Sequence, residues 1–265
     1  MYHNAGHIDK RKMKQKLIFI GNSIVAGYPW NKSKSFASVL RRALKGEYNE
    51  NCTIEDVGKS VGGSTLADSN GSFGIVRTGN DDFKVDCIDL TQPAFAKNTG
   101  FDIVNKGING DTTAGILHRF KTDVMDHQPN MVFILTGTND FIYRDATPDE
   151  AFANLELMAE MVKDAGGVLV YITPLPVDAG KAECMWMAGF GISYDAVNRD
   201  LENFSEMIRQ SGRLFVDLNQ NYLRFIDAVG DVDLAFMDGL HPMPAGQEFI
   251  ASEVLGFLNE YYTRG

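Results

Sequence analysis

The chain has 265 residues, with 25 Lys and Arg against 35 Asp and Glu, and therefore a formal charge of −10 at pH 7. Its content of 44% hydrophobic and 23% charged residues is typical of a folded globular protein and excludes a largely disordered chain. The negative charge disfavours nucleic acid as a partner, because nucleic-acid binding draws much of its affinity from clustered Lys and Arg.

Short apolar runs alternate along the chain with longer stretches of helical periodicity. The runs are too short for helices and are bounded by Gly, Asn, Asp or Pro, which predicts strands at 17–20, 102–104, 131–135, 168–172 and 214–216. Between and after them, the periodicity predicts helices at 33–45, 113–127, 148–165, 194–211 and 244–261. This alternation favours an α/β fold with a mainly parallel sheet.

The segment 46–100 departs from this alternation. It is modestly enriched in glycine and shows only fragments of a strand pattern, such as residues 74–77. A long stretch without regular structure is unusual in a compact domain unless it serves a site. We therefore predict one domain over 1–265, with an insertion at 46–100 packed on it.

The basic N-terminal residues and the cysteines bear on the cellular compartment. Basic residues between 10 and 16 are followed by only four apolar residues, 17–20, whereas an export signal needs about 7–15. No run approaches the roughly 20 apolar residues that span a bilayer. The three cysteines are far apart: Cys52, Cys87 and Cys184. This odd number without close pairs is typical of a reducing compartment, and we predict a cytoplasmic protein without a transmembrane segment.

Four short blocks follow predicted strands or lie in the last loop, and ligands of parallel α/β sheets bind beyond the carboxyl ends of the strands. Gly21-Asn22-Ser23 places a hydroxyl at a strand-to-helix turn, where backbone N–H groups favour negative charge. Residues 107–112 carry glycines that let backbone amides approach a ligand. Gly137-Thr138-Asn139-Asp140 offers a side-chain amide, and Asp238-Gly239-Leu240-His241-Pro242 places a carboxylate and an imidazole three residues apart.

Each block taken alone has an ordinary structural interpretation. Ser23 between a strand and a helix is typical of an N-cap, Asn139 of a cap for the next segment, and His241 before Pro242 of a turn residue. The occurrence of all four blocks in this order indicates a catalytic site instead.

Together these blocks resemble those of the SGNH hydrolases, the GDSL-type esterase and lipase family. The resemblance implies that Ser23 is the nucleophile, His241 the base and Asp238 the acid that orients it, with Gly110 and Asn139 in the oxyanion hole. It implies no cofactor and no metal. These roles agree with elementary chemistry, because a serine hydroxyl needs a base, and an imidazole titrates near neutral pH.

Two positions qualify the resemblance. The family usually has Asp where this chain has Asn22, and we expect altered packing of the loop with retained activity. Residues 57–65 echo residues 104–112, so Gly63 is a second candidate for the oxyanion glycine. We favour Gly110, because the stretch from Gly110 to Asn139 is uninterrupted and is typical of one βαβ unit.

We therefore expect a single-domain, three-layer α/β/α sandwich with a five-stranded, mainly parallel sheet of the flavodoxin-like type. Its expected function is that of a serine esterase that acts on a small or medium acyl ester through an acyl-enzyme on Ser23. Carbohydrate O-acetyl esters, lysophospholipids and thioesters are open alternatives for this small-molecule substrate, and so is the oligomeric state. The alternative from another class is a non-catalytic ligand-binding protein on the same fold.

One apolar cluster after the fourth predicted strand has two interpretations. It comprises Met185, Trp186, Met187 and Phe190. Either these residues pack in the core under a loop, or Trp186 and its neighbours wall an acyl pocket beside Ser23.

Overall fold

The computed structural model describes residues 14–30, 32–45, 100–186 and 191–263. Five strands form one sheet in the order β2-β1-β3-β4-β5, and all of its pairings are parallel. Their bounds are β1 Gln15–Gly21, β2 Phe101–Gly107, β3 Met131–Leu135, β4 Val168–Ile172 and β5 Phe215–Val216. This strand order is that of flavodoxin-like folds, which confirms the predicted fold class.

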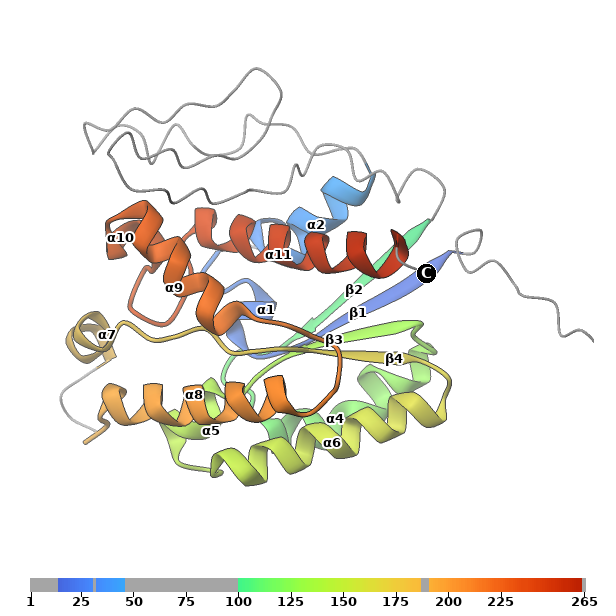
Figure 1. Ribbon diagram of the computed structural model, residues 1–265, viewed down its shortest axis with the longest axis horizontal. Coiled ribbons are helices and arrows are strands. Elements are labelled where there is room, and N and C mark those ends of the chain that lie inside the picture. The colour runs from blue at the N-terminus through green and yellow to red at the C-terminus, as the bar shows by residue number, and fades with distance from the viewer. Residues whose placement is uncertain (1–13, 31, 46–99, 187–190, 264–265) are drawn as a thin grey trace, which may run out of the picture.

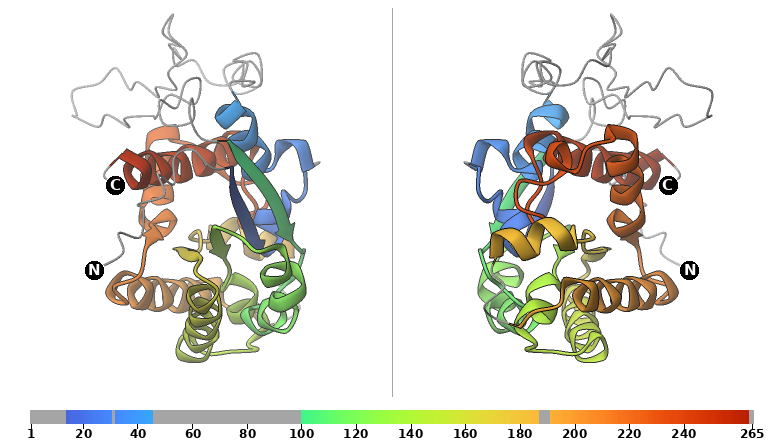
Figure 2. Two further views of the ribbon diagram at one scale, coloured as in Figure 1. Left: turned by 90° about the vertical axis from the view of Figure 1, so that its right-hand side faces the viewer. Right: turned by 90° about the vertical axis from the view of Figure 1, so that its left-hand side faces the viewer.

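Helices cover both faces of the sheet, as Figures 1 and 2 show. α2, α9 and α11 pack on one face, and α4, α6 and α8 pack on the other. The longer helices are α2 Phe36–Lys45, α4 Thr113–Asp123, α6 Pro148–Asp164, α7 Ala179–Trp186, α8 Tyr194–Gln210, α9 Leu218–Val229 and α11 Pro244–Thr263. The short ones are α1 Ser23–Ala26, η2 Lys32–Lys34, η4 Met125–His127, α5 Thr138–Tyr143 and α10 Val232–Ala235.

The first strand shows why the sheet is sandwiched between helices. Leu17 and Phe19 belong to the core under α2 and α11, whereas Ile18 and Ile20 belong to the core against α4 and α6. Because successive side chains of a strand point to opposite faces, a continuous apolar run requires cover on both sides. The run of 17–20 therefore dictates a central, doubly covered strand.

The five predicted strands and the five predicted helices are present; the strands predicted at 131–135 and 168–172 have the predicted ends, and the other elements have shifted ends. The helix predicted at 113–127 ends at Asp123 and is followed by the separate turn η4, and the one predicted at 33–45 begins as an α-helix at Phe36. α9 was not predicted, although the Asp217 side chain accepts a bond from the N–H of Gln220 at its start and Gly230 ends it. α5 and α7 were likewise missed, because both are too short to show a periodic pattern.

The predicted insertion at 46–100 lies outside the described residues, apart from Gly100. Gly63, Cys52, Cys87, Met187 and Phe190 also lie outside them. Within the described ranges, none of the helices has the length and apolar character that crossing a bilayer would require.

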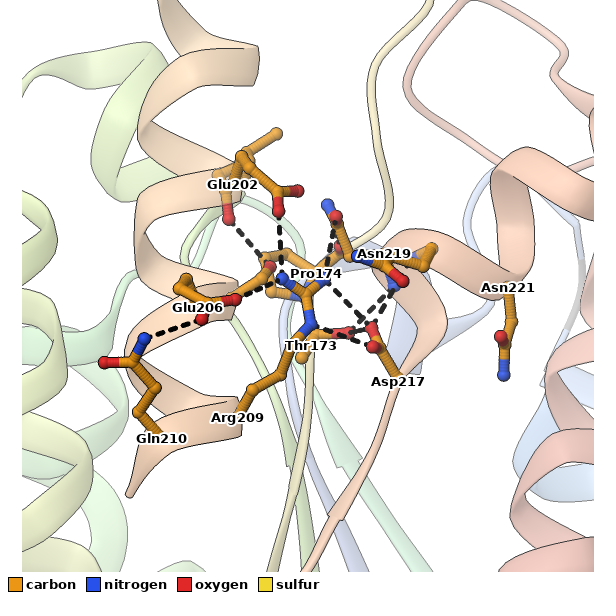
Figure 3. A network of polar contacts seen from close by, with 12 residues as sticks. Thr173, Pro174, Glu202, Glu206, Arg209, Gln210, Asp217, Asn219 and Asn221 are labelled. Carbon is orange, nitrogen blue, oxygen red and sulfur yellow. Dashed lines mark hydrogen bonds and ion pairs between the residues drawn. The ribbon is translucent and has the colours of Figure 1, made fainter. Parts of the chain in front are cut away.

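A network around Arg209 ties the last strand to the rest of the sheet (Figure 3). The Arg209 guanidinium donates to Asp217 (Nε to Oδ2, 2.8 Å) and to Glu202 (Nη1 to Oε1, 2.9 Å). Thr173, which directly follows β4, donates its hydroxyl to Asp217 at 3.0 Å and accepts a bond from the N–H of Asn219 at 2.8 Å. These bonds fix α8, the end of β4 and the start of α9 to one another.

Candidate active site

The turn after β1 presents Ser23 as the first residue of α1. Asn22 is the N-cap of this helix, and its side chain accepts a hydrogen bond from the N–H of Ile24 at 3.1 Å. The interpretation of Ser23 as an N-cap is therefore wrong, because Asn22 fills that position. Asn22 thus makes a local hydrogen bond at the position where the family usually has Asp.

Ser23, His241 and Asp238 form one continuous hydrogen-bonded line. The Ser23 Oγ lies 2.9 Å from Nε2 of His241, and the other ring nitrogen, Nδ1, lies 2.7 Å from Oδ2 of Asp238. All three side chains are buried, Asp238 most deeply, with 1% exposure. The structure thus joins residues that are 218 positions apart in the sequence.

The turn that carries Asp238 and His241 is fixed by the carboxylate itself. Oδ1 of Asp238 accepts hydrogen bonds from the N–H groups of Leu240 at 3.0 Å and His241 at 2.8 Å. Gly239 has φ of +85°, which L side chains rarely adopt, and a Cβ there would collide with the backbone of α7. These contacts hold the turn in the shape that brings the Asp238 carboxylate to Nδ1 of His241, three residues later in the chain.

His241 stabilises the negative charge of the Asp238 carboxylate. Burial by itself would raise the pKa of Asp238, but the hydrogen bonds and positive charge of His241 lower it below its ordinary value. An ionised carboxylate accepts a hydrogen bond from Nδ1–H, and in the neutral imidazole Nε2 is then the acceptor that faces the Ser23 hydroxyl. Tyr194 lies close by, and burial together with the Asp238 charge raises the pKa of its phenol.

The structure also brings Asn139 to the loop that carries Gly110. Asn139 lies in the first turn of α5, and its Nδ2 donates to the main-chain oxygen of Asp111 at 2.9 Å. Gly110, the neighbour of Asp111, has φ of +77°, a conformation that favours glycine. The rival candidate, Gly63, lies outside the described residues, so the preference for Gly110 stays a prediction.

Asp140, the next residue of α5, bonds to the start of α4. Its carboxylate is 1% exposed and accepts bonds from the N–H (3.0 Å) and the hydroxyl (2.6 Å) of Thr113, the first residue of α4. Burial raises the pKa of Asp140 despite these bonds. The contact was not predicted, since its only sequence signal is the place of Asp140 next to Asn139.

Two aromatic rings flank the His241 imidazole. The ring centroid of Tyr28 lies 4.7 Å away and that of Trp186 lies 5.8 Å away. Met185 and Trp186 end α7 with 57% and 38% exposure, so the first of the two interpretations, packing in the core, does not hold for them. α7 lies at the carboxyl edge of the sheet, at the left of Figure 1 and in front in the right-hand view of Figure 2. Tyr28 was missed, because its only signal is its place five residues after Ser23.

Within the part of the chain that the structure describes, no three His, Cys, Asp or Glu side chains are grouped in a way that could hold a metal ion. The line of Ser23, His241 and Asp238 can take a proton from the serine hydroxyl and return it to another oxygen.

Comparison with known proteins gives a consistent result. Residues 87–249 match the GDSL-like Lipase/Acylhydrolase family, a range that holds Gly110, Asn139, Asp238 and His241 and begins after Ser23. The chain is 25% identical over 206 residues to an acetylxylan esterase of Geobacillus stearothermophilus, covering 73% of this chain and 86% of that protein. It is 28% identical over 161 residues to an arylesterase of Vibrio mimicus, covering 59% of this chain and 71% of that one.

Solved structures share the fold. The lipase/acylhydrolase from Enterococcus faecalis aligns with a TM-score of 0.62 at 18% identity, covering 94% of this chain and 97% of that chain. A catalytic mutant of the Geobacillus stearothermophilus acetylxylan esterase aligns with a TM-score of 0.60 at 19% identity, covering 93% and 96%. In that enzyme a serine, an aspartate and a histidine have each been replaced by alanine in variants described as catalytic mutants.

Proposed function

Because the chain belongs to the GDSL-like lipase/acylhydrolase family and is a carboxylic ester hydrolase, we propose that it cleaves small or medium acyl esters through an acyl-enzyme on Ser23. The alternative of a non-catalytic binding protein is not retained for a member of this family. The observation that carries the proposal is the line of contacts from the Ser23 hydroxyl through His241 to Asp238.

In the first half-reaction, Ser23 Oγ attacks the ester carbonyl carbon while Nε2 of His241 takes the hydroxyl proton. The tetrahedral intermediate collapses, the bond to the alcohol breaks, and His241 returns the proton to the leaving alcohol oxygen. In the second, His241 takes a proton from water, the resulting oxygen attacks the acyl carbon, and Ser23 leaves with that proton. Asp238 stabilises the imidazolium that forms in both steps.

We assign the negative oxygen of the tetrahedral intermediate to three donors. These are the backbone N–H groups of Ser23 and Gly110 and one N–H of the Asn139 amide. The contact between Asn139 and Asp111 supports this assignment, because it uses one hydrogen of the amide and holds the group beside the Gly110 loop. Preorganised donors of this kind need no rearrangement as charge develops.

We place the alcohol part of the ester beside Trp186 and Tyr28. His241 must reach the leaving oxygen to protonate it, and these two rings flank its imidazole. Trp186 therefore faces the alcohol side in this proposal, in place of the acyl pocket considered from the sequence. Since one relative is named an acetylxylan esterase, a carbohydrate O-acetyl ester is the first substrate to test.

Hydrolysis of p-nitrophenyl acetate tests the proposal. We expect Ser23→Ala and His241→Ala to abolish turnover while the circular dichroism spectrum is retained, because each change removes a reacting group and little packing. Ser211→Ala, at the end of α8, and His118→Ala, exposed on α4, are matched controls that should keep the wild-type rate. Full activity in Ser23→Ala or in His241→Ala would refute the mechanism.

A substrate panel separates the alternatives within the esterase class. Acetyl and longer acyl groups are to be offered on sugar, glycerophosphate-lipid and thiol leaving groups. We expect the highest kcat/KM for an acetylated sugar, and Trp186→Ala should raise KM for that substrate more than for p-nitrophenyl acetate. Preference for a long acyl chain or for a thioester would instead favour lysophospholipids or thioesters as the substrate class.

A further inference from the structure

Asp111 occupies a central place between the two candidate oxyanion donors. It directly follows Gly110, and its main-chain oxygen receives the Asn139 amide at 2.9 Å. Its own carboxylate accepts a bond from Nε of Arg119 at 2.7 Å. The side chain is only 10% exposed, so this ion pair is largely shielded from water. Whatever fixes Asp111 therefore fixes the spacing between Gly110 and Asn139.

Arg119 reaches three separate parts of the molecule from its place in α4. Besides Asp111, it donates from Nη1 to Asp123 at 2.8 Å on its own helix. Its Nη2 lies 3.4 Å from the main-chain oxygen of Gly21, the last residue of β1. Gly21 is two residues before Ser23, and its oxygen also accepts the N–H of Ile108 at 3.0 Å. One guanidinium thus contacts both the loop of Gly110 and the strand end that leads to Ser23.

The end of β2 is packed closely against α1, the helix that begins with Ser23. A Cβ added at Gly107 would overlap the backbone of Val25 and Ala26 in α1. Asn105 adds a bond from its Nδ2 to the oxygen of Val25 at 2.6 Å. The loop 108–112 leaves this packed region at Gly107 and is then held again at Asp111, so its path is fixed at both ends.

An arginine suits this place better than a lysine. The guanidinium is a planar fork with several N–H donors, so it can hold Asp111 and Asp123 and approach the Gly21 oxygen at the same time. A lysine ammonium carries the same charge on one nitrogen and cannot span these acceptors. The arginine side chain is 14% exposed, and the Arg119 hydrogen bond is the leading cause that lowers the pKa of Asp123.

We propose that Arg119 is a positioning residue for ester hydrolysis, which acts through Asp111 to hold the Gly110 N–H and the Asn139 amide in line with Ser23. The inference rests on the proposed function, because it needs an oxyanion to be formed at these donors. It concerns the alignment of the hole and assigns Arg119 no contact with the substrate.

Kinetics of p-nitrophenyl acetate hydrolysis by Arg119→Lys test this role. We expect kcat to fall about 10- to 100-fold, the cost of a small misplacement of catalytic groups, with KM and the melting temperature little changed. Arg209→Lys is the matched control: its side chain is equally buried, at 14% exposure, and is also paired with acids, but it contacts neither Asp111 nor Asn139. It should keep the wild-type kcat.

A double-mutant cycle with Asn139→Ala separates positioning from a general structural effect. If Arg119 acts through the hole, Arg119→Lys should cost much less in the Asn139→Ala background than in the wild type. Equal losses in both backgrounds, an unchanged kcat in Arg119→Lys, or the same loss in Arg209→Lys would overturn the inference. Should Arg119→Lys fail to fold, Asp111→Asn decides by the same criteria, because it keeps the main-chain oxygen that holds Asn139 and removes the charge and one of the two acceptor oxygens of the side chain.

Failure of this inference is distinguishable from failure of the proposed function. A Ser23→Ala enzyme that retains activity refutes the proposed mechanism, whatever Arg119 does. An inactive Ser23→Ala enzyme together with a fully active Arg119→Lys enzyme refutes the positioning role alone.

Discussion

Two arginines of this molecule are buried to the same extent but hold different parts of the chain. Arg119 and Arg209 both have side chains that are 14% exposed, and each holds more than one carboxylate. The partners of Arg209 join α8 to the start of α9 at the edge of the sheet (Figure 3). Those of Arg119 lead within one residue to Gly110 and directly to Asn139.

Burial and ion pairing do not by themselves mark a functional network. Both clusters satisfy buried charge, which any fold requires. Among the described residues, the bonds of Arg119 reach Gly21, two residues before Ser23, and Asp111, which holds Asn139, whereas those of Arg209 reach Asp217 and Glu202. We therefore expect changes near Arg119 to act on rate and changes near Arg209 to act on stability.

The largest effect on rate is expected for Asp238→Asn. The amide can donate to Nδ1 of His241, which favours the wrong tautomer, so kcat for p-nitrophenyl acetate should fall about 10⁴-fold with the fold retained. Asp233→Asn, whose side chain is 73% exposed, is the control and should remain active. A kcat within tenfold of wild type for Asp238→Asn would show that this carboxylate does not orient the base.

Asn139→Ala should have the next largest effect. Loss of one oxyanion donor typically lowers kcat by about 10²–10³-fold, with little change in KM. Asn221→Ala is the control. It removes an amide that bonds to Glu253 of α11, and it should leave kcat unchanged. If both variants behave alike, the assignment of Asn139 to the oxyanion hole is wrong.

Arg209→Met tests whether the cluster around Arg209 contributes to stability and not to rate. Removing the guanidinium leaves the partly buried Asp217 without its ion pair, and we expect a loss of about 2 kcal/mol in the free energy of unfolding. Urea denaturation measures this loss, and kcat of the folded fraction should stay at the wild-type value. A tenfold or larger fall in kcat would erase the distinction between the two networks.

Arg213→Met should have a smaller effect on stability. Arg213 pairs with Glu156 at 2.6 Å and Glu160 at 2.7 Å, but all three side chains are between 28% and 48% exposed. Solvent screens such pairs, so the free energy of unfolding should change by less than about 1 kcal/mol. A loss as large as that of Arg209→Met would mean that exposure does not separate the two sites.

The pH dependence of stability offers a further test on Asp238. Because the folded-state pKa of this carboxyl lies below its unfolded value, its contribution is present above about pH 4 and is lost as the pH falls through the folded pKa. Stability of the wild type should therefore decline more steeply in acid than that of Asp238→Asn. Parallel acid limbs in thermal melts of the two proteins would contradict this account.

The sheet could be predicted from the sequence because its signal is local. A buried parallel strand needs a continuous apolar run, and 17–20, 131–135 and 168–172 are such runs bounded by turn residues. α9 could have been found from the Asp217 cap and Gly230, whereas α7 offers eight residues of weak pattern. Trp186 was singled out from the sequence but could not be placed, since its contact with His241 depends on tertiary packing.

In the candidate site too, contacts within one turn could be predicted from the sequence and contacts between separate segments could not. Asp238 and His241 are three residues apart and fall under one turn, so their pairing could be anticipated. The link from Asp111 to Arg119 spans eight residues across the start of a helix, and no local rule pairs residues at that distance. The place of Tyr28 beside His241 depends equally on a contact between distant segments.

Covalent labelling of Ser23 is the most direct test that this residue is the nucleophile and that His241 activates it. The protein is to be treated with a fluorophosphonate, digested and analysed by mass spectrometry. We predict a single phosphonyl adduct on the Ser23 hydroxyl, formed in step with the loss of esterase activity and strongly slowed in His241→Ala. Loss of activity with the adduct on another residue, or an active enzyme in which Ser23 stays unlabelled, would contradict the account.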